Sequence, residues 1–291
     1  MSVQESTISA RSRLEAMDWS LVLISQGIES SVHQSDEGLG WNVCVSPGDY
    51  LAATEAIRIY RVENRNWGLR REVFQAGMMF DWVSIVWVAL VCLLYWLNDW
   101  RVDLKTPGIL DTAAVSQGQW WRLFTAIWLH ADLAHLASNC TFGLLLLGLA
   151  MGRYGTGVGL LAAYLSGVGG NVLSWACEPQ RHFGLGASGM VMGCLGLLAV
   201  QSVSLWRKTP RSGGHFLGSL FAGLMLFLLL GVTPGTDVVA HLGGFIAGLI
   251  TGLLLAVRLR AWRKAGPNVA SALLFVVLVL WPWLLALRGT R

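Results

Sequence analysis

Long apolar segments constrain this chain more than any other feature of its sequence. Between residues 77 and 287, seven segments of about twenty residues each carry few charges, and about twenty apolar residues are what a helix needs to cross a bilayer. Because only helices and closed barrels satisfy their backbone in lipid, the sequence predicts an all-α polytopic membrane protein. The segments are 77–97, 132–152, 157–175, 186–205, 215–231, 237–259 and 269–287.

The overall composition agrees with this prediction. Only 13% of the residues are charged, against about 25% in soluble domains. The five cysteines are scattered and form no C-x-x-C pair, which argues against a disulfide framework or a zinc site. The first twenty residues contain no apolar stretch, so we expect no cleaved signal peptide.

Basic residues are distributed unevenly between the two ends of the apolar segments. If all seven segments cross the membrane, thirteen Lys and Arg residues lie on one side and six on the other. Since cytoplasmic loops are rich in Lys and Arg, we expect a cytoplasmic amino terminus, an outside carboxy terminus and a bacterial cytoplasmic membrane. The first side holds Arg58, Arg61, Arg65, Arg70, Arg71, Arg153, Arg207, Lys208, Arg211, Arg258, Arg260, Arg263 and Lys264.

Residues 1–71 read as a small soluble cytoplasmic domain of α+β type. Short runs rich in Val and Ile, at 21–27, 29–35 and 41–45, predict β-strands. A helix is expected after Asp49, which can act as its N-cap, because apolar residues then recur at helical spacing. No catalytic constellation is visible in this part, so an accessory or regulatory role is favoured.

Polar side chains gather near the predicted outer ends of three apolar segments. Such residues are costly inside a membrane and by default indicate function. His135 and Asn139 are four residues apart and therefore share one helix face. Ser188 lies in a Gly-Ala-Ser-Gly sequence at the start of the fourth segment, and His241 lies near the start of the sixth. These side chains, with His130, can converge below the outer surface.

The converging residues have the properties that amide hydrolysis requires. Ser188 can act as a nucleophile if the neutral imidazole of His241 takes its proton. Backbone N–H groups at a helix N-terminus and the side chains of His135 and Asn139 can stabilise the oxyanion. Small residues at every fourth position permit close packing of the fourth segment against the sixth. These are Gly189 and Gly193 in one segment and Ala240, Gly244, Gly248 and Gly252 in the other.

Each of these residues also has a simpler role open to it. Ser188 can merely cap its helix, His241 can be a hydrogen-bonded packing residue, and His130 can be interfacial. Asn139 can bond another helix. Asp237, one turn before His241, can either orient the imidazole or stabilise the helix N-terminus, and the second role is favoured.

A metal site is a further alternative for the polar cluster. His130, Asp132 and His135 lie close together in the sequence. However, the chain contains no H-E-x-x-H motif, and a metal site would leave the Gly-Ala-Ser-Gly sequence unexplained.

Four motifs, in this order, resemble those of the rhomboid intramembrane proteases. They are Trp-Arg-Leu-Phe-Thr at 121–125, His-x4-His-x3-Asn at 130–139, Gly-Ala-Ser-Gly at 186–189 and Ala-His-Leu-Gly-Gly at 240–244. The resemblance covers about residues 99–252. It implies a six-helix core, here predicted over residues 77–259. The N-terminal domain and the seventh transmembrane helix, expected within 266–291 from its apolar sequence, lie outside the resemblance.

The resemblance also implies roles for individual residues. Ser188 would be the nucleophile and His241 its base, in a dyad that uses no metal and no cofactor. His135, Asn139 and the Ser188 backbone would form the oxyanion hole. The positions that match supporting residues of the family are Trp121, Arg122, His130, Gly186, Gly189, Gly244 and Gly248.

One position departs from the family pattern. Four residues after the serine, family members usually carry Phe or Tyr packed on the catalytic histidine, whereas this chain has Met192. A thioether can still contact an imidazole, but it would orient the ring less firmly. The departure removes no group that the chemistry requires.

The resemblance implies a serine endopeptidase that cleaves transmembrane protein substrates near the outer surface of the bilayer. We expect no nucleic-acid partner.

Three alternatives stay open. An inactive rhomboid-like scaffold would typically lack the serine or the histidine. A small-molecule transporter would have inverted repeats and charges at mid-membrane. A metal-dependent intramembrane protease would be sensitive to chelators.

Overall fold

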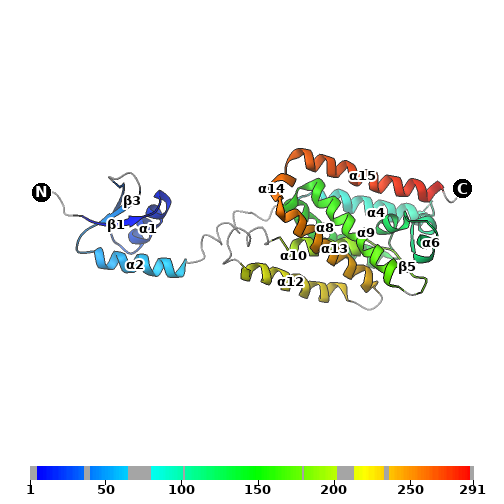
Figure 1. The fold of residues 1–291 in the computed structure, drawn as a ribbon, viewed down its shortest axis with the longest axis horizontal. Helices are drawn as coiled ribbons and strands as arrows, with labels where there is room; N and C mark the ends of the chain where they lie inside the picture. The colour runs from blue at the N-terminus through cyan, green and yellow to red at the C-terminus, as the bar shows by residue number, and fades with distance from the viewer. Residues whose placement is uncertain are drawn as a thin grey trace. The chain divides into compact units, whose positions relative to one another are not determined.

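A computed structural model describes residues 5–35, 40–64, 80–100, 102–178, 180–201, 213–232 and 236–288. The chain forms two compact units, Met1–Gly77 and Met78–Arg291, each described separately below (Figure 1). The predicted boundary between residues 71 and 77 lies outside the described residues, as do Arg65, Arg70, Arg71, Arg207, Lys208 and Arg211.

The N-terminal unit is a three-stranded antiparallel sheet with two helices. Its elements are β1 (Ser6–Ala10), α1 (Arg13–Ser25), β2 (Ser30–Gln34), β3 (Trp41–Val45) and α2 (Tyr50–Glu63). The strand order is β1-β3-β2, with Val43 paired to both Ile8 and Val32. Trp19, Leu23, Val43 and Ile57 belong to its hydrophobic core. The strands predicted at 29–35 and 41–45 and the helix after Asp49 are confirmed.

The strand predicted at residues 21–27 is wrong, because this run is the second half of α1. Ser12 caps the helix by accepting a hydrogen bond from the Glu15 backbone N–H at 3.2 Å. Ala16, Trp19 and Leu23 then follow at helical intervals and are buried. The cap and this period outweigh the β-propensity of the Leu-Val-Leu-Ile run. Strand β1 was not predicted, since its sequence contains a single large apolar residue.

The membrane unit is built from apolar helices that overlap the predicted segments, although α4 begins only at Ser84 and α10 already ends at Ala199. Over the described residues these are α4 (Ser84–Trp100), α8 (Leu133–Tyr154), α9 (Thr156–Cys177), α10 (Ser188–Ala199), α12 (Gly213–Gly231), α13 (Val238–Val257) and α15 (Ala265–Arg288). Helices α8, α9, α13 and α15 are long and apolar enough to cross a membrane, and the other three have shorter apolar stretches. The arrangement of six helices plus one therefore stays a prediction.

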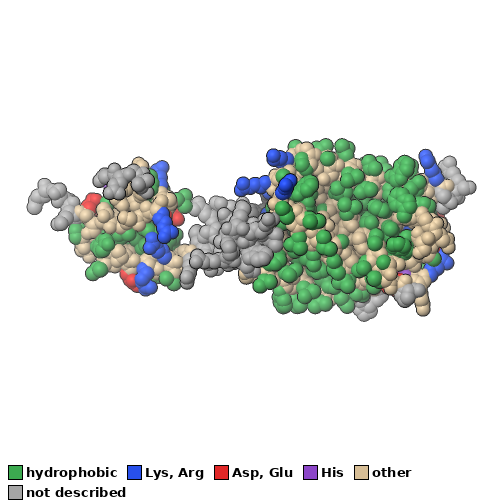
Figure 2. Space-filling view, viewed as in Figure 1, with side chains coloured by type: hydrophobic (Ala, Val, Ile, Leu, Met, Phe, Trp, Pro, Cys, Tyr) green, Lys and Arg blue, Asp and Glu red, His purple; other side chains and the backbone are tan. Residues whose placement is uncertain are grey.

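The surface of the membrane unit is itself largely apolar. Figure 2 shows hydrophobic side chains over most of its visible face, with Lys and Arg gathered at its ends. Leu229, Leu254 and Leu273 are each more than 60% exposed. A soluble protein rarely exposes so continuous an apolar surface, whereas a protein surrounded by lipid does.

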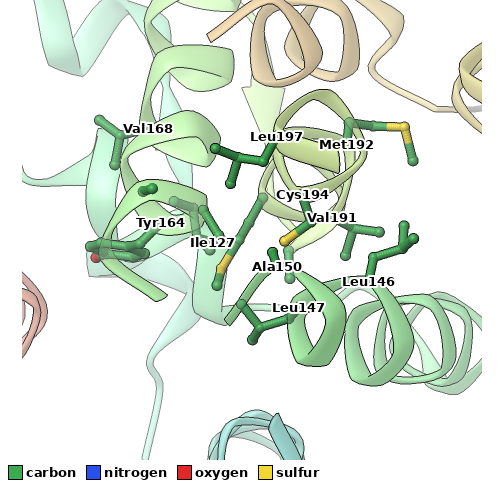
Figure 3. Close-up of a cluster of buried hydrophobic side chains, with 14 of the residues drawn as sticks. Ile127, Leu146, Leu147, Ala150, Tyr164, Val168, Val191, Met192, Cys194 and Leu197 are labelled. Carbon is green, nitrogen blue, oxygen red and sulfur yellow. The ribbon is translucent and has the colours of Figure 1, made fainter. Parts of the chain in front are cut away.

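Helix α10 lies at the centre of the membrane unit. It packs against α8, α9, α12 and α13, and ten of its twelve residues are buried. Figure 3 shows Val191, Cys194 and Leu197 of this helix among Tyr164 of α9 and Leu147 of α8. A helix that is apolar on all sides is suited to such a position, and its first residue is Ser188.

Glycines allow α10 and α13 to approach until their backbones touch. A Cβ placed on Gly244 would overlap the carbonyl oxygen of Gly189, and one on Gly248 would overlap that of Gly193. The predicted packing of the fourth apolar segment against the sixth is thereby confirmed. Because Ser188 precedes Gly189 and His241 follows Ala240, this contact sets the spacing between the two candidate catalytic residues.

A long connection between α4 and α8 folds into short elements at one end of the unit. These are α5 (Lys105–Gly108), β4 (Leu110–Asp111), α6 (Thr112–Ser116), α7 (Arg122–Thr125) and the 3-10 helix η1 (Ala126–Trp128). Strand β4 pairs with β5 (Phe183–Gly184), which lies just before α10. The short helix α14 (Leu259–Trp262) joins α13 to α15 at the other end.

Candidate active site

Ser188 begins α10 directly after a sharp bend of the backbone. Gly186 has φ of +127°, a conformation that side chains other than glycine rarely adopt. Its N–H donates to the carbonyl of Ala126 at 3.0 Å, which ties the bend to the first residue of η1. Ser188 itself is half-buried, and its N–H belongs to the first turn of a helix, where backbone donors have no partner within the helix.

His241 lies buried in the first turn of α13, and its tautomer is defined by a hydrogen bond. Its Nδ1 lies 2.8 Å from the carbonyl oxygen of Gly231, the last residue of α12. A carbonyl oxygen can only accept, so Nδ1 carries the proton. The neutral ring therefore presents its lone pair at Nε2, which is the atom needed to accept a proton from a serine.

Ser188 and His241 lie in adjoining first turns of two packed helices. A Cβ on Gly189 would lie 3.6 Å from the carbonyl oxygen of Ala240, so the residues next to the serine and the histidine are in contact. The structure thus brings the predicted nucleophile and base into one small region. A direct hydrogen bond between their side chains stays a prediction.

His135 and Asn139 project from α8 toward the bend that precedes the serine. A Cβ on Gly186 would lie 2.6 Å from Cε1 of His135 and 3.7 Å from Nδ2 of Asn139. Nδ2 of Asn139 is buried and has no hydrogen-bond partner among the described residues. A buried donor without a partner is unusual, and an oxyanion would supply the missing acceptor.

His130 is buried beside His135. It is 1% exposed, and its ring packs edge-on against that of His135 at a centroid distance of 5.2 Å. It lies in the short segment between η1 and α8. Its position agrees with a supporting rather than a reacting role.

Arg122 fastens the loop that connects α4 to α8. Its guanidinium donates to the carbonyls of Ile109 at 2.7 Å and Thr106 at 3.1 Å, and to the Gln119 side chain at 2.7 Å. Trp121 occupies the position before α7, and its carbonyl accepts from the Thr125 backbone N–H at 3.0 Å. Both residues therefore lie in the connection between α4 and α8.

Met192 lies one turn after Ser188 and is buried. Its sulfur lies 3.4 Å from the position of a Cβ on Gly231, beside the ring of Phe227. It thus contacts the segment whose carbonyl holds His241. Met192 therefore packs against the segment that contains Gly231, whose carbonyl accepts the hydrogen bond from His241.

Asp237 was correctly expected to stabilise the N-terminus of α13. Its Oδ1 accepts from the Ala240 N–H at 2.8 Å. Its Oδ2 contacts His182 Nε2 at 2.8 Å and accepts from Ser174 at 2.9 Å. The partner of His241 Nδ1 is a backbone carbonyl instead of this carboxylate. His182, Ser174 and the Gly231 carbonyl were missed from the sequence, because no motif identifies them.

The described residues bring one set of three potential metal ligands together, and it lies in the N-terminal unit. It consists of Glu5, His33 and Cys44. His130, Asp132 and His135 do not form such a set. The Asp132 carboxylate caps α8 by accepting from the His135 backbone N–H at 2.8 Å.

Comparison with known proteins gives the family of this chain. The family model described as the rhomboid domain matches residues 117–258, which include all four polar motifs. Rhomboid protease GluP of Bacillus subtilis is 32% identical over 216 residues, which are 71% of this chain and 40% of that protein. The chain belongs to the rhomboid family.

Other relatives of this rhomboid come from distant organisms. Rhomboid-like protease 3 of Toxoplasma gondii is 29% identical over 239 residues, covering 77% of this chain and 88% of that protein. RHOMBOID-like protein 6, mitochondrial, of Arabidopsis thaliana is 34% identical over 154 residues, covering 52% and 49%. The chain thus spans between 40% and 50% of the length of GluP and the plant protein. Family and apolar helices together identify an integral membrane protein.

Proposed function

We propose that this rhomboid is an intramembrane serine endopeptidase that cleaves transmembrane protein substrates near the outer surface of the membrane. The observation that supports it best is the hydrogen bond from His241 Nδ1 to the Gly231 carbonyl at 2.8 Å. This bond leaves Nε2 as a proton acceptor in the turn adjoining Ser188. The presence of both residues also argues against an inactive scaffold.

The proposed reaction follows from these groups. Ser188 Oγ attacks the carbonyl carbon of the scissile amide while His241 Nε2 takes the hydroxyl proton. The oxyanion accepts hydrogen bonds from the Ser188 N–H and the side chains of Asn139 and His135. His241 then donates the proton to the leaving amine, an acyl-enzyme remains, and a water molecule activated by His241 hydrolyses it.

The proposal extends to domain layout and orientation. Residues 1–71 form a soluble cytoplasmic accessory domain, residues 77–259 form the six-helix catalytic core, and residues 266–291 contain a seventh transmembrane helix. The excess of Lys and Arg at one end of the helices supports a cytoplasmic amino terminus and an outside carboxy terminus. We propose a bacterial cytoplasmic membrane as the location.

A cleavage assay with the full chain in lipid vesicles tests the function. The substrates are single transmembrane helices with Gly or Pro near the outer end, because a substrate helix must unwind and these residues lower helix stability. We expect cleavage that persists with a metal chelator and decreases when leucines replace the Gly or Pro. Cleavage abolished by the chelator would favour a metal-dependent protease, and cleavage unaffected by leucine would contradict the unwinding argument.

Asn139 offers a specific test of the oxyanion site. Replacing Asn139 with Ala should lower kcat about 10²–10³-fold, as loss of one oxyanion donor typically does, with KM little changed. Thr141→Ala is the matched control, since Thr141 lies on the same helix, is exposed, and donates only to its own helix at the Ala137 carbonyl. A kcat for Asn139→Ala within a factor of three of the control would exclude this role.

A further inference from the structure

Two consecutive residues before the serine contact carboxylates from two different parts of the fold. Arg181 donates to Asp111 in a bidentate pair, with Nε to Oδ1 at 3.0 Å and Nη2 to Oδ2 at 2.6 Å. His182 Nε2 lies 2.8 Å from Asp237 Oδ2. The guanidinium holds the pKa of the Asp111 carboxyl below its usual range. The loop that leads into Ser188 is therefore bonded to Asp111 through Arg181 and contacts Asp237 through His182.

The backbone of this loop is fastened as well. The His182 N–H donates to the Thr112 hydroxyl at 2.9 Å, and the Thr112 N–H donates to the His182 carbonyl at 3.1 Å. Phe183 and Gly184 continue this pairing with β4. The loop is thus fixed relative to α6 and β4, and from Gly184 the chain reaches Ser188 in four residues.

Asp237 connects the same loop to the turn that carries His241. One carboxylate oxygen caps α13, and the Asp237 carbonyl accepts from the His241 N–H at 3.0 Å. The other oxygen is shared by His182 and by Ser174, a fully buried residue of α9. The position of the first turn of α13 therefore depends on the Asp237 side chain, which His182 also contacts.

We propose that His182 is a positioning residue for catalysis. Through Asp237 it keeps the loop that presents Ser188 in register with the helix turn that presents His241, and the Arg181–Asp111 pair holds the far side of that loop. This inference rests on the proposed protease function. A displacement of about 1 Å between reacting groups can lower a rate about 10²-fold, so loss of the His182–Asp237 contact should affect chemistry.

The test compares two substitutions of similar size at position 182. In His182→Gln, an amide N–H can replace the imidazole as a donor to Asp237 at similar reach, whereas His182→Phe fills the space without a hydrogen bond. The measured quantity is the rate constant for covalent labelling of Ser188 by a fluorophosphonate, using the full chain in detergent well below its melting temperature. Asp237→Ser keeps a helix cap but removes the second carboxylate oxygen, which contacts His182. Glu178→Gln controls for a charge change in the same loop.

We expect His182→Phe and Asp237→Ser to label about ten- to a hundred-fold more slowly than the parent. His182→Gln should recover to within about threefold, and Glu178→Gln should equal the parent. Equal labelling rates of the Phe variant and the parent would overturn the positioning role of His182 but leave the proposed function standing. Equal losses of labelling rate in the Gln and Phe variants would have the same meaning. No labelling of a folded parent would instead overturn the proposed function, and the inference with it.

Discussion

Replacing His241 with Asn is expected to lower the rate of substrate cleavage by about 10³-fold or more. In serine proteases the nucleophile and the base act as a unit, and loss of either removes most of the acceleration. The amide nitrogen of Asn can occupy the position of Nδ1 and keep the bond to the Gly231 carbonyl. The variant should therefore fold while lacking the Nε2 acceptor.

Cleavage rates and thermal unfolding should be measured together for this variant. Leu242→Val is a suitable control, because Leu242 is the next residue of α13 and is 40% exposed. The control should cleave at the parental rate. A folded His241→Asn protein that keeps more than a tenth of parental kcat/KM would show that another group serves as the base.

Replacing Gly244 with Ala is expected to destabilise the fold and abolish activity together. The added methyl group would overlap the carbonyl oxygen of Gly189 in α10, and neither backbone can move away cheaply in a packed interior. Overpacking of this kind costs about 1–3 kcal/mol. Because Gly189 follows Ser188, separation of the two helices also moves the nucleophile away from His241.

Gly218 provides the matched control for this substitution. It lies in α12, and a Cβ placed there would meet no atom of the described residues within 4 Å. Gly218→Ala should therefore leave the melting temperature and cleavage unchanged, whereas Gly244→Ala should lower both. Parental stability and activity in Gly244→Ala would rule out the close packing of α10 against α13.

The apolar helices and the glycine contact were predictable because each depends on a regular pattern. Membrane helices need long apolar runs, and close helix pairs need small residues at a period of four. The small residues on both segments, with the expected approach of Ser188 to His241, predicted that Gly244 and Gly248 pack against α10. The same reasoning failed at residues 21–27, where an apolar run was too short to separate strand from helix, and the cap at Ser12 was overlooked.

The residues that hold the catalytic groups were not predictable in the same way. The Gly231 carbonyl is a backbone group at a helix end, and sequence carries no signal for its contact with His241. His182 and Ser174 meet Asp237 from a loop and from another helix, 55 and 63 residues away along the chain. Such contacts depend on how the helices pack, which the local sequence does not specify.

Covalent labelling of Ser188 tests the central claim most directly. The purified full chain in detergent is treated with a fluorophosphonate probe beside Ser188→Ala and His241→Asn, and the modified peptide is identified by mass spectrometry. An activated serine predicts labelling of the parent at Ser188, none in Ser188→Ala and about 10³-fold slower labelling in His241→Asn. Labelling that persists in Ser188→Ala, or a folded parent that is not labelled, would contradict the assignment of Ser188 and His241 as a catalytic dyad.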